Sequence, residues 1–322
     1  MQELKNYTAL IEMEIGKIDL PTTPANLYDP LRYFMGLGGK RMRPILTLLG
    51  AKLFDKDPLS AVNASLAVEV FHNFTLIHDD IMDEAPLRRN QETVHKKWNL
   101  SIAILSGDVL FVKAYQLLAM QDRKHLHDLL ELFNRTAIEV CEGQQLDMDF
   151  ESRADVTIPE YLEMIRLKTS VLLGCALELG AIIADADLSD RKNIYQFGEN
   201  LGIAFQIQDD ILDLYADPDK FGKQVGGDVI ANKKTLLKLK AQELANPVQL
   251  ETLKQLEYET DSERKVQKTR ELYTSIGARE ACEITMKHHY NIAMAALNAI
   301  KTGDTNKFPL VQLADQLMAR ES

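Results

Sequence analysis

The 322-residue sequence predicts an all-α protein, and three observations support this prediction. Nearly every segment carries apolar residues at a helical period, and no convincing alternating strand pattern appears. Helix-start signals are clear: Asp57 stands directly before Pro58, and Thr157 or Ile158 precedes Pro159. The indicated helices are long and apolar over more than one narrow stripe, which is typical of a bundle centre. No stretch has linker composition, so we expect one domain of long antiparallel helices over residues 1–322.

Each main helix follows from its own signals. Asp57 caps a helix that runs to about Asp83, and a strongly apolar helix covers residues 102–120. Two further helix starts are expected, at Thr157 or Ile158 and at Ser189. The stretches between helices predict loops near 21–30, 84–92, 151–157, 185–188 and 216–228.

The charge balance limits the classes of partner. The net charge is -11, from 37 basic and 48 acidic residues, which argues against a nucleic-acid binder with a broad basic surface. A small anionic ligand remains possible where metal ions supply the positive charge. We therefore expect no nucleic-acid partner.

Cysteine usage and hydropathy indicate a compartment. The three cysteines (Cys141, Cys175 and Cys282) are scattered without a CxxC pair, so we expect buried thiols in a reducing cytoplasm. The N-terminal segment lacks the apolar centre of a signal peptide. The longest apolar run, 171–184, contains Glu178 and is too short to span a bilayer. A cytoplasmic protein without a membrane span is expected.

Two matched acidic motifs end two apolar helices. DDIMD covers residues 79–83 and DDILD covers 209–213, and these are the only DDxxD patterns in the sequence. Residues four apart share a helix face, which pairs Asp79 with Asp83 and Asp209 with Asp213. The middle aspartates, Asp80 and Asp210, turn away by about 100° and are expected to have supporting roles. Two such pairs on facing helices would form a funnel of carboxylate oxygens.

This number of hard oxygen ligands suits Mg²⁺, which prefers one or two carboxylates together with substrate phosphates. The helical His/Glu spacing of a zinc site is absent from the sequence. The alternative for a single motif is a solvated acidic face. Two copies, each followed by basic residues, favour the metal site.

Basic residues follow both motifs and also precede the first one. Gly38 and Gly39 come directly before a cluster of cations in GGKRMRP, a pattern suited to the close approach of an anion. The other candidate cations are Arg88, Arg89, Lys168, Lys223, Lys233 and Lys234. Acidic and basic clusters within an apolar helical shell predict a ligand with a Mg²⁺-bridged diphosphate head and a hydrocarbon tail. The apolar residues before Asp79 would line the tunnel for that tail.

The combined motifs resemble the trans-isoprenyl diphosphate synthase (polyprenyl synthetase) family, short-chain type. They are GGKRMRP, LIHDDIMDEAPLRRN, GQQLD at 143–147, LKTS at 167–170 and FQIQDDILDLYADPDKFGKQVGGDVIANKKT. The resemblance implies the isoprenoid synthase type I fold, with helices around a central cavity. It also implies a Mg²⁺-dependent prenyltransferase that joins isopentenyl diphosphate head to tail with an allylic diphosphate (dimethylallyl, geranyl or farnesyl). The implied product is a trans C15–C20 diphosphate, geranylgeranyl or farnesyl.

The resemblance also assigns roles position by position. Three Mg²⁺ ions, which Mn²⁺ can replace, would be held by Asp79 and Asp83 for two ions and by Asp209 for the third. Supporting roles would fall to Asp80, Asp210 and Asp213. The allylic diphosphate would contact Arg88, Lys168 and Lys233, with assistance from Lys223. Residues matched to positions near the allylic cation are Thr169 and Gln206.

Isopentenyl diphosphate would contact Gly39, Lys40, Arg43, His72 and Arg89. Helical geometry independently places His72, seven residues before Asp79, within about 20° of the same face. The alternative for His72 is a core histidine with satisfied hydrogen bonds.

In the implied mechanism the allylic C–O bond ionises, the isopentenyl double bond attacks the cation, and a proton leaves to the pyrophosphate, so no protein base is needed.

Product length is assigned to Phe74 and Phe71, five and eight residues before Asp79. Bulky rings at these positions resemble those of short-chain synthases; alternatively both are ordinary core aromatics and the tunnel floor lies elsewhere.

The sequence departs from the family pattern at two places. The family's usual RRG is Arg88-Arg89-Asn90 here, and asparagine tolerates the left-handed backbone of such a turn. The C-terminal LMARES lacks the basic tail of some relatives, for which Arg320 alone could substitute.

The competing functions are a longer-chain polyprenyl diphosphate synthase, a class I terpene cyclase and a non-catalytic prenyl-binding subunit. DDILD and GGKRMRP argue against a cyclase, and the presence of both aspartate motifs argues against a non-catalytic subunit. Relatives dimerise through central apolar helices, so the helix at 102–120 predicts a homodimer.

Overall fold

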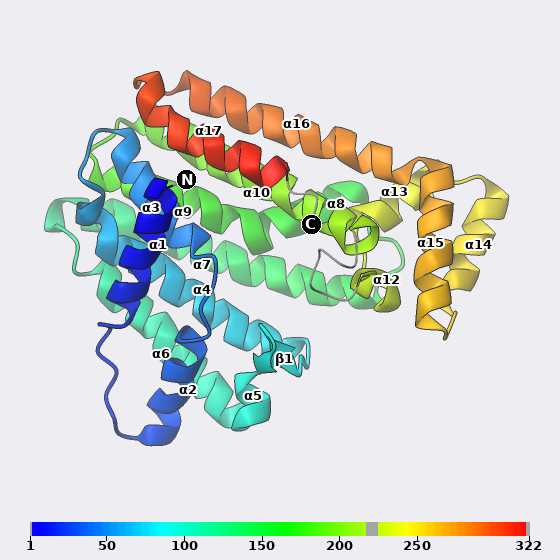
Figure 1. Ribbon diagram of the computed structural model, residues 1–322, viewed down its shortest axis with the longest axis horizontal. Coiled ribbons are helices and arrows are strands. Elements are labelled where there is room, and N and C mark those ends of the chain that lie inside the picture. Colours follow the sequence, from blue (N-terminus) through cyan, green and yellow to red (C-terminus); the bar gives the residue numbers. More distant parts are fainter. Residues whose placement is uncertain (1, 217–224, 320–322) are drawn as a thin grey trace. The chain divides into compact units, whose positions relative to one another are not determined.

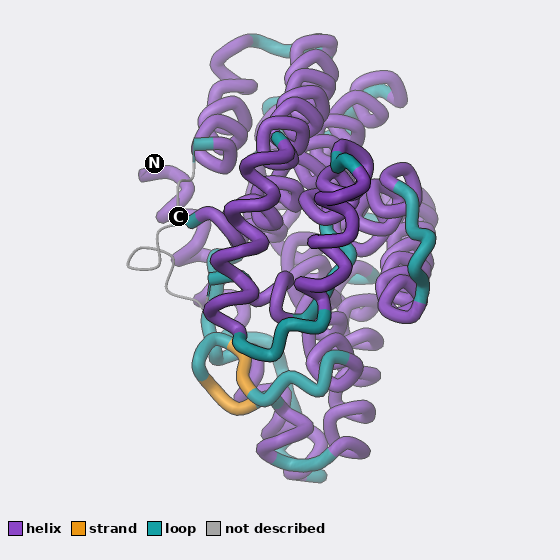
Figure 2. Tube along the Cα trace, turned by 90° about the vertical axis from the view of Figure 1, so that its right-hand side faces the viewer, coloured by secondary structure: helices purple, strands orange, loops and turns teal. Residues whose placement is uncertain are grey.

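The computed structural model describes residues 2–216 and 225–319. It is 79% helical, which confirms the all-α prediction. Within the described residues the only strands are β1 (Leu87–Arg88) and β2 (Gln91–Glu92), the short orange segment in Figure 2. The helices therefore position every described candidate residue except those on this ribbon and in the loops.

Contacts divide the chain into two compact units. Unit 1 comprises Met1–Phe133 and Cys175–Arg191, and unit 2 comprises Asn134–Gly174 and Lys192–Ser322. The first aspartate motif belongs to unit 1 and the second to unit 2. A single domain over residues 1–322 stays a prediction.

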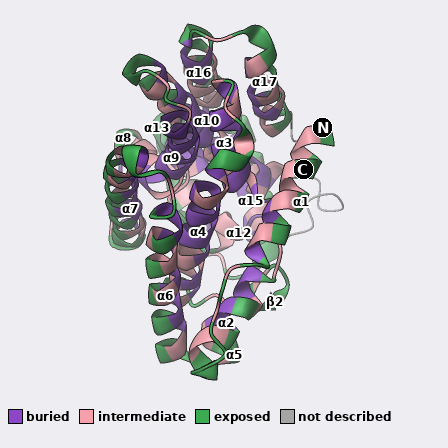
Figure 3. Cartoon of the chain, turned by 90° about the vertical axis from the view of Figure 1, so that its left-hand side faces the viewer, coloured by how far each residue is buried: buried purple, intermediate pink, exposed green. Residues whose placement is uncertain are grey.

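Unit 1 is built around α4. Its elements are α1 (Gln2–Ile15), α2 (Ala25–Met35), α3 (Met42–Leu53), η1 (Pro58–Ala61), α4 (Val62–Met82), α5 (Val94–Lys97), α6 (Leu100–Leu118) and parts of α7 (Arg123–Ser152), α9 (Val171–Ile183) and α10 (Leu188–Tyr215). Asp57 starts the predicted helix as expected, because its carboxylate accepts a hydrogen bond from Leu59 N at 3.0 Å. The first turn is a 3₁₀ helix, and α4 then packs against α3 and α6. Most of α4 is buried, as Figure 3 shows.

The predicted loop at 84–92 contains the β1–β2 ribbon, so the loop prediction is wrong for these strand residues. Leu87 pairs with Glu92 and Arg88 with Gln91, which leaves Arg89 and Asn90 as a two-residue turn. Both have positive φ, 53° and 62°, as the twisted two-residue hairpin turn requires. The expectation that Asn90 adopts left-handed backbone is confirmed.

Unit 2 contains the remaining helices. Besides parts of α7, α9 and α10 they are α8 (Ile158–Ile165), the π-helical turn η2 (Arg166–Ser170), α12 (Gly227–Ile230), α13 (Leu236–Leu244), α14 (Pro247–Glu257), α15 (Ser262–Ile276), α16 (Ala278–Ala299) and α17 (Asp304–Met318) (Figure 1). Thr157 caps α8 in a capping box with Glu160, which settles the choice between Thr157 and Ile158. The helix expected from Ser189 begins one residue earlier, at Leu188.

Two sequence expectations need qualification. Cys175 and Cys282 are buried, but Cys141 is exposed, so the prediction of a buried thiol is wrong for Cys141. Among the described helices, α6 is long and apolar enough to cross a membrane by length and composition. Core helices of soluble proteins pass the same test, and α6 packs one face against α2 and α4.

Candidate active-site residues

The first motif exposes its outer aspartates more than its middle one. Asp80 is only 1% exposed, whereas Asp79 is half-buried and Asp83 is exposed. The Arg88 guanidinium donates from Nε to Asp80 Oδ1 at 2.7 Å, so Asp80 anchors this arginine as a supporting residue would. Burial raises the pKa of Asp80 to about 6 against the opposing effect of Arg88, and the charges of Asp79 and Asp83 raise it further.

Cations crowd around His72 on α4. Arg43 Nη1 lies 3.1 Å from His72 Nε2. Burial lowers the pKa of His72 well below its usual value, and the charges of Arg43, Arg89, Arg88 and Arg41 lower it further. The Nε atom of Arg43 is buried and has no hydrogen-bond partner among the described residues. An unpartnered guanidinium donor beside neighbouring cations is suited to an incoming anion.

Gly39 completes this cationic cluster. Its φ is 154°, and a Cβ there would lie 3.0 Å from the Arg89 guanidinium. A side chain at position 39 would therefore push against the arginine that the hairpin turn presents. The structure brings together Gly39, Arg43, His72 and Arg89, and Lys40, the residue after Gly39, is exposed. Their role in binding isopentenyl diphosphate stays a prediction.

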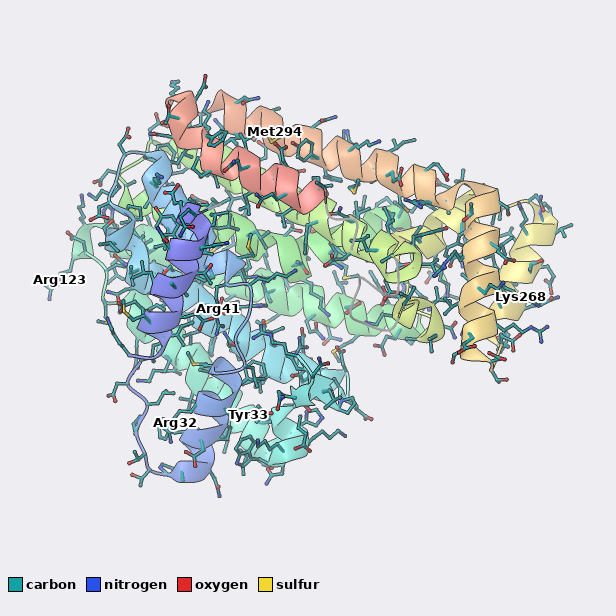
Figure 4. All side chains as sticks on the ribbon, viewed as in Figure 1. Arg32, Tyr33, Arg41, Arg123, Lys268 and Met294 are labelled. Carbon is teal, nitrogen blue, oxygen red and sulfur yellow. The ribbon has the colours of Figure 1, made fainter. Side chains whose placement is uncertain are left out.

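Arg41 was not singled out from the sequence. It is 2% exposed and donates to Glu12 at 2.8 Å and to Glu69 at 2.6 Å. Figure 4 labels it beside α1, the helix that carries Glu12. Arg41 therefore connects α1 to α4 through structural ion pairs, and its guanidinium donors are already used in these contacts.

Aromatic rings form a cluster around the part of α4 that precedes the first motif. Phe71 and Phe74 have ring centroids 5.5 Å apart, and Phe111 of α6 lies 6.0 Å and 5.0 Å from them, respectively. Tyr115 of α6 lies 5.2 Å from both Phe111 and Phe133. Sequence reasoning missed the three rings outside α4, although Phe111 and Tyr115 have the one-turn spacing of a shared helix face.

The second motif repeats the burial pattern with different partners. Asp210 is 5% exposed, accepts a hydrogen bond from the buried Tyr161 hydroxyl, and accepts another from Leu236 N at 3.2 Å. Gln206, expected near the allylic cation, also donates to Asp210. Burial raises the pKa of Asp210 to about 7, and the nearby Asp228 carboxylate adds to this shift. Tyr161 is a supporting residue that sequence reasoning missed.

Carboxylates gather around Asp213. Asp228 N donates to Asp213 Oδ2 at 3.0 Å, and Gly226 N donates to Asp213 O at 2.6 Å. The pKa of Asp228 is raised to about 6, first by burial and then by the charge of Asp213, with smaller effects of Asp147 and Asp209. Lys233 opposes this shift. Such mutual repulsion among oxygen ligands is relieved by a divalent cation.

Lys168 lies on the π-helical turn. Its Nζ donates to Asp147 Oδ2 at 2.6 Å, and Asp147 is the last residue of the GQQLD motif on α7. A Cβ at Gly143 would collide with Lys168 N, so glycine is needed for this close approach. The turn also carries the half-buried Thr169. Local π-helix is frequent at functional sites.

The remaining predicted residues have simple outcomes. Lys233 is exposed, and its backbone N donates to Asp228 O at 2.9 Å. Lys223 and Arg320 lie outside the described residues. Asp147 and Asp228 are additional carboxylates near the second motif to which the sequence analysis assigned no role.

Comparison with known proteins identifies the family. The family model for polyprenyl synthetase matches residues 24–276. A geranylgeranyl pyrophosphate synthase from Geoglobus acetivorans is 37% identical over 321 residues, covering 99% of this chain and 98% of that protein. A crystal structure of geranylgeranyl pyrophosphate synthetase from Pyrococcus horikoshii is 35% identical with a TM-score of 0.93, covering 99% and 98% of the two chains. Another geranylgeranyl pyrophosphate synthase structure is 45% identical with a TM-score of 0.94, covering 99% of each chain.

The chain belongs to the polyprenyl synthetase family and has the all-α isoprenoid synthase fold. It is a trans-prenyltransferase of the short-chain prenyl diphosphate synthase class.

Enzymes of this class depend on divalent metal ions. In the described part of the chain, no group of three or more His, Cys, Asp or Glu side chains forms a ready-made metal site. The donors nevertheless fit a hard cation. They are carboxylate oxygens, and the raised pKa values of Asp80 and Asp228 reflect burial together with like charge from neighbouring aspartates.

Proposed function

We propose that this enzyme condenses isopentenyl diphosphate with dimethylallyl, geranyl or farnesyl diphosphate to a trans C15–C20 product, geranylgeranyl or farnesyl diphosphate. One observation carries the proposal: the cationic cluster of Gly39, Arg43, His72 and Arg89 contains a buried guanidinium donor without a hydrogen-bond partner among the described residues. A diphosphate supplies the acceptor oxygens that this cluster lacks. The names of the relatives support the short-chain product.

The metal is Mg²⁺, for which Mn²⁺ substitutes. Asp79 and Asp83 are the proposed ligands of two ions and Asp209 of the third, with supporting roles for Asp80, Asp210 and Asp213. When bound, these ions stabilise negative charge on the departing pyrophosphate. The anchored middle aspartates support this division, because Asp80 and Asp210 already accept hydrogen bonds from the protein.

The chain's own cations hold the two diphosphates. Arg88, Lys168 and Lys233 contact the allylic diphosphate, with Lys223 assisting, and Thr169 and Gln206 lie near the allylic carbons. Arg88 is oriented by Asp80, and Lys168 by Asp147. Both pairs preorganise charge at the position where it develops during ionisation.

Isopentenyl diphosphate contacts Arg43, His72 and Arg89, with Lys40 and the Gly39 backbone. Because arginine only donates, His72 Nε2 is the acceptor in its contact with Arg43, which leaves the proton on Nδ1. The lowered pKa keeps His72 neutral, so it contributes a hydrogen-bond donor and no additional charge.

The tunnel floor consists of the aromatic cluster around Phe71 and Phe74. Phe71 is 1% exposed, whereas Phe74 is half-buried and packs against His78 at 4.8 Å between centroids. The exposed edge of Phe74 is the surface on which a prenyl tail of limited length would end. Phe111 supports this ring from α6.

The enzyme is a cytoplasmic homodimer that pairs through α6. Leu100, Ile104, Leu105 and Val112 are between 41% and 57% exposed along this helix. An apolar face of this kind on a helix that packs its other side within unit 1 fits a second copy of the chain. Sedimentation at the monomer mass for the wild type would refute the pairing, and Leu105→Glu is expected to produce that monomer.

Product analysis tests the proposal directly. The purified protein is incubated with isopentenyl diphosphate, Mg²⁺ and each of the C5, C10 and C15 allylic primers, and the products are sized. A C15 or C20 end product supports both the reaction and the Phe74 floor. Products of C30 or longer would retain the synthase and move the floor deeper. Failure to elongate any primer would favour a cyclase or a non-catalytic subunit.

A further inference from the structure

The short helix α12 is tied to the second aspartate motif at its N-terminal end. Gly226 N donates to Asp213 O at 2.6 Å, and Asp228 N donates to Asp213 Oδ2 at 3.0 Å. Lys233 N then donates to Asp228 O at 2.9 Å, so one turn of chain positions Asp228 and Lys233 together. The positive charge of Lys233 lowers the pKa of Asp228, against the larger opposing effects of burial and Asp213.

The C-terminal end of the same turn is held by Lys265 of α15. Lys265 is 5% exposed, and its Nζ donates to Ile230 O at 3.4 Å and to Glu257 O at 3.2 Å. Asn232, directly before Lys233, also donates its side-chain amide to Glu257 O at 3.2 Å. A lysine is rarely buried without partners, and carbonyls at helix C-termini favour a cation. Lys265 thus joins the last residue of α12 to the last residue of α14.

Apolar packing alone does not hold this turn. A cavity of about 40 Å³ lies behind it, and its lining includes Asp228, Lys233 and Lys265. The close contact on this side is between Gly226 and Val266, the residue after Lys265, where a Cβ would lie 2.5 Å from Val266 Cγ2. The lining also includes Val229, Leu256 and Tyr273, but because the space behind the turn is only partly filled, the hydrogen bonds of Lys265 and Asn232 contribute to holding the turn in place.

We propose that Lys265 is a positioning residue of the prenyl transfer reaction, acting through α12 on Asp228 and Lys233. This inference rests on the proposed function, which assigns the allylic diphosphate to Lys233. A small displacement of a positioned group is costly, since a misplacement of about 1 Å can lower a rate by about 10²-fold. Lys265 therefore affects the allylic substrate and leaves the isopentenyl site of unit 1 unchanged.

The first test is the variant Lys265→Met, which keeps an unbranched side chain one atom shorter than lysine and removes the charge and the donors. We expect kcat/KM for the allylic diphosphate to fall about 10- to 100-fold, the usual loss on removing a supporting residue. The KM for isopentenyl diphosphate is expected to stay unchanged. Lys265→Arg should restore most of the activity.

Lys268→Met, on the exposed side of the same helix (Figure 4), is the matched control and should behave as wild type. Wild-type kinetics for Lys265→Met, or equal changes in both KM values, would overturn the proposal.

A double-mutant cycle with Lys233→Ala tests whether Lys265 affects the reaction through the turn that carries Lys233. If Lys265 acts through the turn, Lys265→Met adds little once Lys233 is absent, whereas fully additive losses would refute the coupling. Asn232→Ala replaces Lys265→Met in the cycle if the latter does not fold.

Calorimetry with Mg²⁺ and inorganic pyrophosphate separates this proposal from the proposed function, because it needs no turnover. Weaker binding by Lys265→Met with recovery in Lys265→Arg supports the role of Lys265, even where the wild type elongates no primer. Unchanged pyrophosphate affinity in Lys265→Met would contradict it.

Discussion

The two aspartate motifs have the same sequence pattern but different surroundings. In unit 1 the middle aspartate, Asp80, is held by a cation, Arg88, and further arginines surround the neighbouring His72. In unit 2 the middle aspartate, Asp210, is held by neutral donors, the Tyr161 hydroxyl and Leu236 N, while carboxylates gather around Asp213. The first region presents mainly cationic donors of the kind that suits phosphate, whereas the second presents mainly carboxylate acceptors, so we expect the second to depend more on metal ions.

The largest expected effect comes from an outer aspartate. Asp79→Asn and Asp209→Asn should each lower kcat/KM by about 10²- to 10³-fold, the loss seen when one preorganised electrostatic group is removed. Asp80→Asn should cost only about tenfold, because Asp80 acts by orienting Arg88. Steady-state kinetics over a Mg²⁺ titration measures all three variants. Equal losses for Asp79→Asn and Asp80→Asn would contradict the distinction between outer and middle aspartates.

The arginines of unit 1 should discriminate between substrates. Arg89→Ala removes charge-assisted hydrogen bonds worth about 1.5–3 kcal/mol, and should raise the KM for isopentenyl diphosphate about 10- to 100-fold. The KM for the allylic diphosphate should change little. Lys96→Ala, an exposed cation of the same unit, is the control. A parallel rise in both KM values would assign Arg89 to a general electrostatic role.

Substitutions at two glycines, one in each unit, test how rigid their surroundings are. A Cβ at Gly143 would meet the backbone of Lys168, which cannot move alone, whereas a Cβ at Gly107 would meet the end of the His78 side chain, which can turn away. Gly143→Ala should therefore lower the free energy of unfolding by about 1–3 kcal/mol, and Gly107→Ala by less. Chemical denaturation measures both. A larger loss for Gly107→Ala would show that the ring packing of His78 is the more rigid of the two.

Phe74→Ala should lengthen the product, because it opens the half-buried edge of the aromatic cluster. We expect at least one additional isoprene unit at the end of elongation. Phe308→Ala, at an exposed ring, is the control. An unchanged distribution of product lengths would place the tunnel floor elsewhere.

The smallest effect concerns pH and the start of α8 in unit 2. Hydrogen bonds from the Thr157 side chain and backbone lower the pKa of Glu160 from 4.5 to about 2, and Arg153 contributes further. The stabilisation is therefore present above pH 4.5 and is lost as the pH falls toward 2. The difference in Tm between wild type and Glu160→Gln should shrink over this range. Glu251→Gln, at an exposed glutamate of α14, is expected to show no such trend.

Much of the site could be predicted because its geometry is local. The four-residue spacing of Asp79 and Asp83 defines a shared helix face wherever the helix lies, and the same holds for Asp209 and Asp213. Helical rotation also distinguished the middle aspartates from the outer ones, and in the structure both middle aspartates are buried. Their supporting role stays a prediction. Asn90 was recognised as a residue suited to a left-handed turn for the same local reason.

Other features could not be predicted because they depend on residues distant in sequence. Asp147 is 21 residues from Lys168, and Tyr161 is 49 residues from Asp210. Neither pairing has a local signal, since a carboxylate or a tyrosine on a helix looks the same in the sequence whether or not it has a distant partner. The exposure of Cys141 likewise depends on which face of α7 packs inward.

The helical class, the positions of the two acidic motifs and the family could be read from the amino-acid sequence, because helical period, caps and spaced motifs are properties of neighbouring residues. The tertiary structure alone decided which cation or hydroxyl holds each middle aspartate, that Arg89 lies against Gly39, and that Lys265 joins α12 to α14. These contacts arise from helix packing, which brings distant residues within hydrogen-bond distance and buries them so that each polar group requires a partner.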